Sequence, residues 1–130
     1  MNPRLQRSSP TREHGRTYTI GRHFEGRSPE VRAIYDRIVS AARALGPVRE
    51  EAKKTSIHLM HKTAFAGVAT RRDTLILTIK SASDIRSPRI AKREQASANR
   101  WHLEVRLDDP EQVDGELKTW LKNAFQLSET

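Results

Sequence analysis

One stretch of the chain, residues 54–80, limits the possible folds more than any other, because it has the pattern of consecutive β-strands. Within it, leucine or isoleucine occupies every second position from Leu75 to Ile79. A period of two places such residues on one face of a strand. Similar runs cover residues 55–60 and 64–69, and only short polar connections separate them. The stretch therefore predicts two or three antiparallel neighbours at the centre of a sheet.

Two amphipathic helices are predicted on either side of this stretch. The first covers residues 29–45, where a Ser-Pro pair gives a typical helix start and a Gly-Pro pair gives a stop. The second covers residues 109–125, with Asp109 as N-cap and Gln112 as its capping-box partner. Both segments carry apolar residues at helical spacing along one stripe. Each helix can therefore pack against the predicted sheet.

Residues 101–107 show the clearest strand pattern of the chain, because Trp101 and three aliphatic residues alternate with polar ones. The preceding segment, residues 81–100, is polar and lacks a period, so we predict a long connection that is functional or mobile. Together these elements predict an α+β fold. We expect two layers, with an antiparallel sheet of four or more strands and two long helices on one of its faces. The other face would expose residues such as His58 and His102.

The chain is long enough for one domain. Residues 1–16 contain a single leucine among arginine, serine, proline and glycine, which is too little apolar surface to offset the entropy of ordering. We therefore predict a disordered basic arm over residues 1–16, a single α+β domain over residues 17–127 and a frayed C-terminus over residues 128–130.

The composition and the motifs exclude several classes of function. The chain has no cysteine, so disulfides, thiol catalysis and cysteine-based zinc sites are excluded. No apolar run approaches the ~20 residues of a membrane span, so we expect no membrane partner and a cytoplasmic location. His58 and His61 are the most closely spaced histidines, but residues three apart in a strand point to opposite faces, so we expect no metal site.

No paired carboxylates, nucleophile motif or phosphate-binding glycine loop is present. We therefore expect no catalytic residue and no cofactor, and the sequence favours a binding module over an enzyme.

The net charge of +8 is unevenly distributed along the chain. Residues 17–80 hold twelve basic and six acidic residues, whereas residues 101–130 hold three basic and seven acidic ones. A basic excess raises association rates with polyanions and supplies sequence-independent affinity for nucleic acid. Nearly all of the seven aromatic residues lie on predicted core stripes, so no stacking platform for bases is expected. The charge therefore predicts contacts to phosphates rather than to base edges.

Eight basic residues in the sheet, its turns and the long connection are the predicted contacts for nucleic acid or another polyanion. They are Lys54, Arg71, Arg72, Lys80, Arg86, Arg89, Lys92 and Arg93.

Several short blocks of the chain, in a fixed order, resemble a known family. These blocks are Thr19, His23-Phe24, Ser28-Pro29-Glu30-Val31-Arg32, Lys54-Thr55, Phe65-Ala66, Ser87-Pro88-Arg89-Ile90 and Asp109-Pro110-Glu111. Over about residues 17–126 the chain is similar to the small, uncharacterised bacterial proteins of the family called domain of unknown function 5655. The resemblance implies a small α+β module without an agreed activity, in some cases fused to domains linked to restriction-type systems.

The chain departs from some of these relatives at its N-terminus. Some of them carry a cysteine-containing, zinc-hook-like segment where this chain has cysteine-free residues 1–16, so the metal expectation is not carried over. Gly21-Arg22 also replaces an acidic pair that is common in the first short helix of the family, which weakens any role assigned to that turn.

Two interpretations of function therefore remain open from the sequence. The first is a small basic, non-catalytic module that contacts nucleic acid or another polyanion through phosphate charge. The alternative is a protein-interaction or subunit-assembly module that uses the exposed sheet face to bind a partner or a second copy. The salt dependence of nucleic-acid binding separates them, because only the first predicts a steep dependence.

Overall fold

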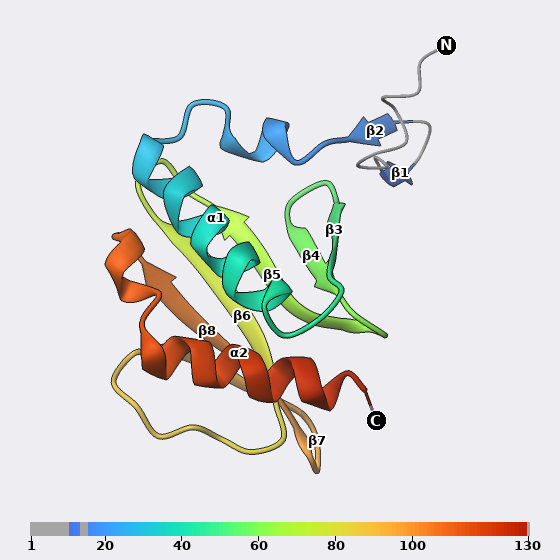
Figure 1. Ribbon diagram of the computed structural model, residues 1–130, viewed down its shortest axis with the longest axis vertical. Helices are drawn as coiled ribbons and strands as arrows, with labels where there is room; N and C mark the ends of the chain where they lie inside the picture. The colour runs from blue at the N-terminus through green and yellow to red at the C-terminus, as the bar shows by residue number, and fades with distance from the viewer. Residues whose placement is uncertain (1–10, 14–15, 130) are drawn as a thin grey trace.

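A six-stranded antiparallel sheet forms the centre of the structure, a computed structural model that describes residues 11–13 and 16–129 (Figure 1). The strand order is β3-β4-β5-β6-β8-β7. The strands are β3 (Arg49–Ala52), β4 (Ile57–Met60), β5 (Ala64–Thr70), β6 (Leu75–Ser81), β7 (Ile90–Ser97) and β8 (Arg100–Leu107). With the two α-helices described below, the sheet makes the fold α+β, as the sequence predicts.

The four strands predicted from apolar alternation are present as β4, β5, β6 and β8. Their register follows the predicted alternation, since Leu77 pairs with Val68 on one side and with Val105 on the other, and all three are buried. The polar residues between them share the opposite face, where Thr78 pairs with Gly67 and Glu104. That face remains partly exposed.

Two further strands lie at the edges of the sheet, and one of them corrects the interpretation of residues 81–100. That segment is not a connection throughout, because Ile90–Ser97 forms β7 and pairs with β8. Seven of its eight residues are exposed, so an edge strand of this kind needs no apolar alternation. Opposite charges help to hold it, since Lys92 lies opposite Glu104. The other edge strand, β3, is only four residues long.

The first helix, α1 (Pro29–Arg43), begins at the predicted Ser-Pro pair and ends two residues before the predicted boundary. The second predicted helix is divided into two. Asp109 forms the predicted capping box with Gln112, but the box opens only a short 3-10 helix, η3 (Pro110–Gln112). The backbone leaves helical geometry at Val113, and a second N-cap, Asp114, starts α2 (Gly115–Leu127). The capping-box pattern was therefore correct, but it marked a different helix.

The hydrophobic core lies between the helices and the central strands. Both α1 and α2 contact β6, α2 also contacts β5, and the two helices contact each other. Residues Ile34 and Ile38 of α1 and Leu117 and Leu121 of α2 are completely buried there. One core therefore joins the two helices to the sheet.

In the described part of the chain, three short elements precede α1. The 3-10 helix η2 (Gly21–Phe24) lies beside β5, and β1 (Thr11–Glu13) pairs with β2 (Arg16–Tyr18) in a separate two-stranded sheet. The predicted arm of residues 1–16 falls largely outside the described residues. At the C-terminus, Ser128 is buried and its amide donates to the carbonyl of Ala124, while Thr130 lies outside the described part. Among the described helices, none has the length and apolar character required to cross a membrane.

Candidate functional site

The eight predicted polyanion contacts fall into three places. Lys54, Arg71 and Arg72 lie in the turns at one end of the sheet, and Lys80 and Lys92 lie on its partly exposed face. The remaining three, Arg86, Arg89 and Arg93, lie in β7 or in the connection before it. The three groups differ in how many carboxylates surround them.

Arg89 is occupied by interactions within the protein. Its Nη1 lies 3.0 Å from a carboxylate oxygen of Asp114 and 3.0 Å from one of Glu116, and its Nη2 donates to the carbonyl of Gln112 at 2.8 Å. The guanidinium also lies 5.6 Å from the ring centre of Trp120. Burial acts to lower the pKa of Arg89, but the bonds to both carboxylates outweigh it and raise the pKa. Arg89 therefore joins the start of β7 to the N-terminus of α2.

Asp114 is the N-cap residue of α2 and contacts Arg89. Its carboxylate accepts a hydrogen bond from the amide of Leu117 at 3.0 Å, which caps α2. This backbone bond, followed by the bond from Arg89, lowers the pKa of Asp114. The carboxylate is thus held in its charged form by the same contacts that hold the helix.

Arg86 and Arg93 share one carboxylate, that of Asp84. Arg93 Nε lies 2.8 Å from it and Arg93 also donates to the carbonyl of Ile85, whereas Arg86 Nε lies 3.4 Å away and its side chain is 85% exposed. The side chain of Asp84 is only 14% exposed. Arg93 and Asp84 therefore hold the segment between β6 and β7 in place, and one positive charge of the two arginines remains uncompensated, mainly on the exposed Arg86.

The β3–β4 and β5–β6 turns, at one end of the sheet, form a different surface. Three segments meet there: η2 with the residues after it, the β3–β4 turn and the β5–β6 turn. His23 Nε2 lies 2.8 Å from the carbonyl oxygen of Lys53, and the amide of Ser28 donates to the carbonyl of Arg72 at 2.8 Å. Arg27 Nε donates to the hydroxyl of Thr70 at 2.9 Å, and that hydroxyl donates to the carbonyl of His23. These bonds fix the three segments against one another.

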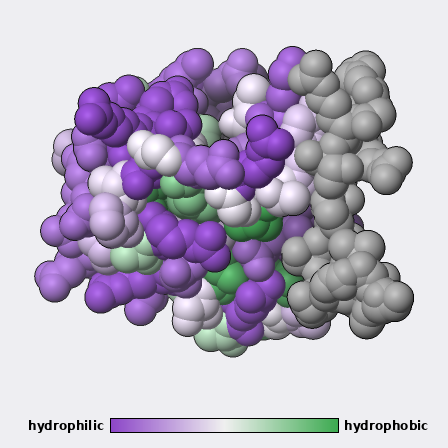
Figure 2. Space-filling model, turned by 90° about the horizontal axis from the view of Figure 1, so that it is seen from above, coloured by the Kyte–Doolittle hydropathy of each residue, from purple (hydrophilic) through white to green (hydrophobic). Residues whose placement is uncertain are grey.

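Basic residues from all three segments gather at this surface, which we call the basic end. They are Arg22, Arg27, Lys53, Lys54, Arg71 and Arg72. Lys53 pairs with Glu51 at 3.5 Å, and Arg27 is bonded to Thr70. Within residues 18–129, no ion pair engages Arg22, Arg71 or Arg72, and the carboxylates of Glu25 and Asp73 in the same segments are also unpaired. Figure 2 looks onto the side of the molecule where η2 lies and shows a mostly hydrophilic surface around a few hydrophobic residues.

Sequence reasoning missed Arg22 and Arg27 as members of the basic end. They lie in η2 and just after it, and only the packing of this segment beside β5 brings them to the sheet turns. A short 3-10 helix has no period that would reveal this contact. The resemblance to relatives with an acidic pair at Gly21-Arg22 had even argued against a role for that turn.

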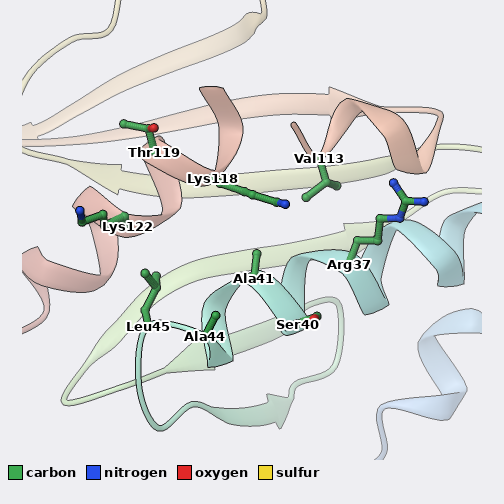
Figure 3. A pocket seen from close by; sticks show the side chains of 9 residues that line it. All are labelled: Arg37, Ser40, Ala41, Ala44, Leu45, Val113, Lys118, Thr119 and Lys122. Carbon is green, nitrogen blue, oxygen red and sulfur yellow. The ribbon is translucent and has the colours of Figure 1, made fainter. Parts of the chain in front are cut away.

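A groove of about 600 Å³ lies between α1 and α2 on another side of the molecule (Figure 3). Small and apolar side chains line it, among them Ala41 of α1 and Ala44 and Leu45 just after it. Arg37, Lys118 and Lys122 also line it, and Figure 3 shows Lys118 reaching across toward the side of Arg37. No carboxylate is part of its lining. We call this region the helix groove.

The histidines do not converge on a metal site within the described parts of the chain, which hold no cluster of three or more His, Cys, Asp or Glu side chains suited to a metal ion. His61 stacks on Phe125 with ring centres 4.0 Å apart, and its two ring nitrogens lie 2.9 Å from the carbonyl of Pro47 and 3.0 Å from the carboxylate of Glu129. Its role is thus to hold the end of α2 against the β4–β5 turn.

Comparison with known proteins identifies a family. The family described as "Domain of unknown function (DUF5655)" matches residues 20–128, which include η2, both long helices and the whole six-stranded sheet. No curated protein and no solved structure matches the chain. The family match covers most of the chain and agrees with the resemblance carried by its short sequence blocks. The chain therefore belongs to the DUF5655 family.

Proposed function

We propose that the protein is a small, basic, non-catalytic binding module that contacts the phosphates of nucleic acid through the basic end. The observation that carries the proposal is the meeting of η2, the β3–β4 turn and the β5–β6 turn, because hydrogen bonds fix all three backbones. A surface held in this way loses little backbone entropy when it binds a ligand.

Charge supports phosphate as the group that is bound. Arg71, Arg72 and Arg22 have no carboxylate partner within the described segments, so their charge remains available. Each arginine can donate two parallel hydrogen bonds to one phosphate. Glu25, Glu51 and Asp73, together with Asp108 bonded to Thr74, reduce the net charge of the surface, but six basic residues outnumber them there.

The position of the aromatic residues argues against base reading. Tyr35, Phe65, Trp120 and Phe125 are buried, and Phe24 of η2 is partly buried against the core with the guanidinium of Arg32 over its ring. Without a fully exposed ring at the basic end, stacking on single-stranded bases has no platform there. The proposed binding therefore follows the phosphate backbone and is independent of base sequence.

The fold supports a surface made of turns. We infer that α1 and α2 together cover one face of the sheet, since both contact β6 and both lie in front of the strands in Figure 1. The β3–β4 and β5–β6 turns then project from the strand ends of a sheet that is packed against both helices. The proposal also places the protein in the cytoplasm, where nucleic acid is abundant and a chain without cysteine needs no oxidising compartment.

The test is a binding titration of the intact chain against labelled duplex DNA, single-stranded DNA and RNA at two salt concentrations. We expect binding at low salt, a steep loss of affinity at higher salt, and a weaker, flatter response for the variant K54E/R71E/R72E. The slope of log affinity against log salt should decrease by up to about three units, roughly one per lost phosphate contact.

The matched control is R37E/K118E/K122E, which changes the net charge by the same amount in the helix groove. If the control loses as much affinity as K54E/R71E/R72E, the effect belongs to total charge and the basic end has no special role. If none of the three nucleic acids binds at low salt and light scattering shows a dimer, the proposal is wrong. The partly exposed sheet face would then be the assembly surface.

A further inference from the structure

A hollow of about 330 Å³ lies on the partly exposed face of the sheet, within the range of small-molecule sites. Strands β4, β5, β6 and β8 contribute to it together with Ser56, and neither helix does. Its centre is Gly67 on β5, which pairs with His58 on one side and with Thr78 on the other. Because glycine has no side chain, the side chains of His58 and Thr78 form two walls over a floor of small residues that includes Ala69. We call this region the open-face hollow.

Its polar side chains have few partners within the protein. Lys80 and His102 lie opposite each other in the register of β6 and β8 and both line the hollow. Among residues 18–129, the side chains of His58, Thr78 and Lys80 have neither a hydrogen bond nor an ion pair, and His102 has only a loose pair with Glu94 at 3.9 Å. The ammonium of Lys80, the hydroxyl of Thr78 and the two imidazole rings therefore line one hollow whose base is made of small residues.

The charges around the hollow favour a ligand with a single negative charge. Lys80 is the only lysine or arginine in the lining. Glu51 lies opposite His58 on β3, and Glu104 lies opposite Thr78 on β8. These two carboxylates flank the lining without being part of it, and they would repel a doubly charged group such as phosphate.

His58 adds a neutral polar group. Burial is the main cause that lowers its pKa, followed by the nearby Lys53, and Lys80 acts in the same direction while Glu51 opposes it. The ring is therefore uncharged at neutral pH and offers one N–H donor.

We propose that the open-face hollow binds a small carboxylic acid in its ionised form, with the carboxylate at Lys80 and Thr78 and a compact apolar body over Gly67 and Ala69. The ammonium of Lys80 supplies the charge and Thr78 and His58 supply hydrogen-bond donors. This site uses none of Lys54, Arg71 or Arg72, so it is independent of the basic end.

The experiment is an NMR titration of the intact chain with benzoate, which has both a carboxylate and a flat apolar body. Three other ligands serve for comparison. Acetate has the carboxylate but no apolar ring, benzamide has the ring but no charge, and inorganic phosphate is an anion without a carboxylate. Benzoate should shift the amides of Gly67, Thr78 and Lys80 and the ring signals of His58, with saturation at lower concentration than the other three. Saturation with benzoate should also raise the pKa of His58, because a nearby anion favours the charged ring.

Two variants locate the site. G67V should abolish benzoate binding by filling the hollow, and the fold can accept it, because a Cβ at Gly67 meets only His58 Cδ2 at 4.0 Å and valine suits a strand. K80Q removes the charge and should weaken binding at least tenfold. The control K92Q lies on the same face but outside the hollow and should change affinity by less than twofold.

Three results would overturn the proposal. The first is that the NMR shifts caused by benzoate map to the helix groove instead. The second is that K80Q binds benzoate as tightly as the unmodified protein does. The third is that phosphate or benzamide binds more tightly than benzoate. K80Q decides the matter even if G67V does not fold.

Discussion

Arg89 and the pair Arg71-Arg72 are residues of the same kind with the same predicted role, but their surroundings in the structure are opposite. Arg89 has two carboxylates, a carbonyl and an indole ring around its guanidinium. In the described part of the chain, Arg71 and Arg72 have no carboxylate partner. The difference comes from residues that are distant in sequence, since Asp114 lies 25 positions after Arg89. A basic residue in a sequence is therefore a candidate contact only until its long-range neighbours are known.

The comparison also separates two contributions of charge. Arg89 contributes to folding, because it joins β7 to the start of α2, whereas Arg71 and Arg72 contribute a surface potential that folding does not use. The following predictions test this separation.

The largest effect is expected for Arg89→Glu. The change removes hydrogen bonds to two carboxylates and places a third carboxylate beside them, so the free energy of unfolding should fall by about 2–3 kcal/mol. Urea denaturation measures it, with Arg71→Glu as the matched reversal. Arg71→Glu should change stability by less than about 0.5 kcal/mol. Equal losses in the two variants would mean that Arg89 is not a structural residue.

Asp114→Ala should have the next largest effect. It removes the N-cap of α2 together with one partner of Arg89, and loss of a cap alone costs about 1–2 kcal/mol. The pKa of Asp114 is lowered in the folded state, so its contribution is fully present above the unfolded pKa of about 3.9 and is lost as the pH falls through the lower folded pKa. Unfolding curves of both proteins between pH 7 and pH 2 should therefore converge at the acid end. A constant difference across this range would point to the cap geometry alone.

Arg93→Ala should destabilise the protein by about 1 kcal/mol, because it leaves the mostly buried carboxylate of Asp84 with only a weak partner. Thermal unfolding monitored by circular dichroism is sufficient for the measurement. Asp84→Asn in the same background should then cost little more, since the two side chains act together. Fully additive losses would show that they do not.

The smallest effect is expected for Arg86→Ala, below about 0.5 kcal/mol, although Arg86 shares the same carboxylate. Its side chain is 85% exposed and its ion pair is long, so water replaces the contact readily. A loss equal to that of Arg93→Ala would show that exposure does not distinguish the two arginines.

The sequence predicted those parts of the fold that have a local cause. Apolar alternation located β4, β5, β6 and β8, since one face of each is buried. The same rule could not find β7, because the side chains of this edge strand are mostly exposed and apolar residues do not recur at every second position. The capping box at Asp109 was recognised, but Val113 interrupts the helix for reasons of backbone geometry that no pattern marks.

The candidate sites were less predictable, because they depend on contacts between distant segments. Arg22 reaches the basic end only through the docking of η2 against β5. The alternation placed His58 and Thr78 on the same face, but only the strand register sets Gly67 between them. Register follows from turn geometry and packing, which a single sequence does not state.

The two edge strands of the sheet affect how readily the protein can aggregate at high concentration. Strand-to-strand growth into fibres would have to begin at β3 or β7, the outer strands of the described sheet. β3 offers four residues with Arg49, Glu50 and Glu51 among them, and β7 carries the consecutive charged residues Lys92, Arg93 and Glu94 and two irregularities in its register. Charged, short or irregular edges discourage the addition of a further strand. Concentrated protein should therefore resist amyloid-type growth even where its faces bind other molecules.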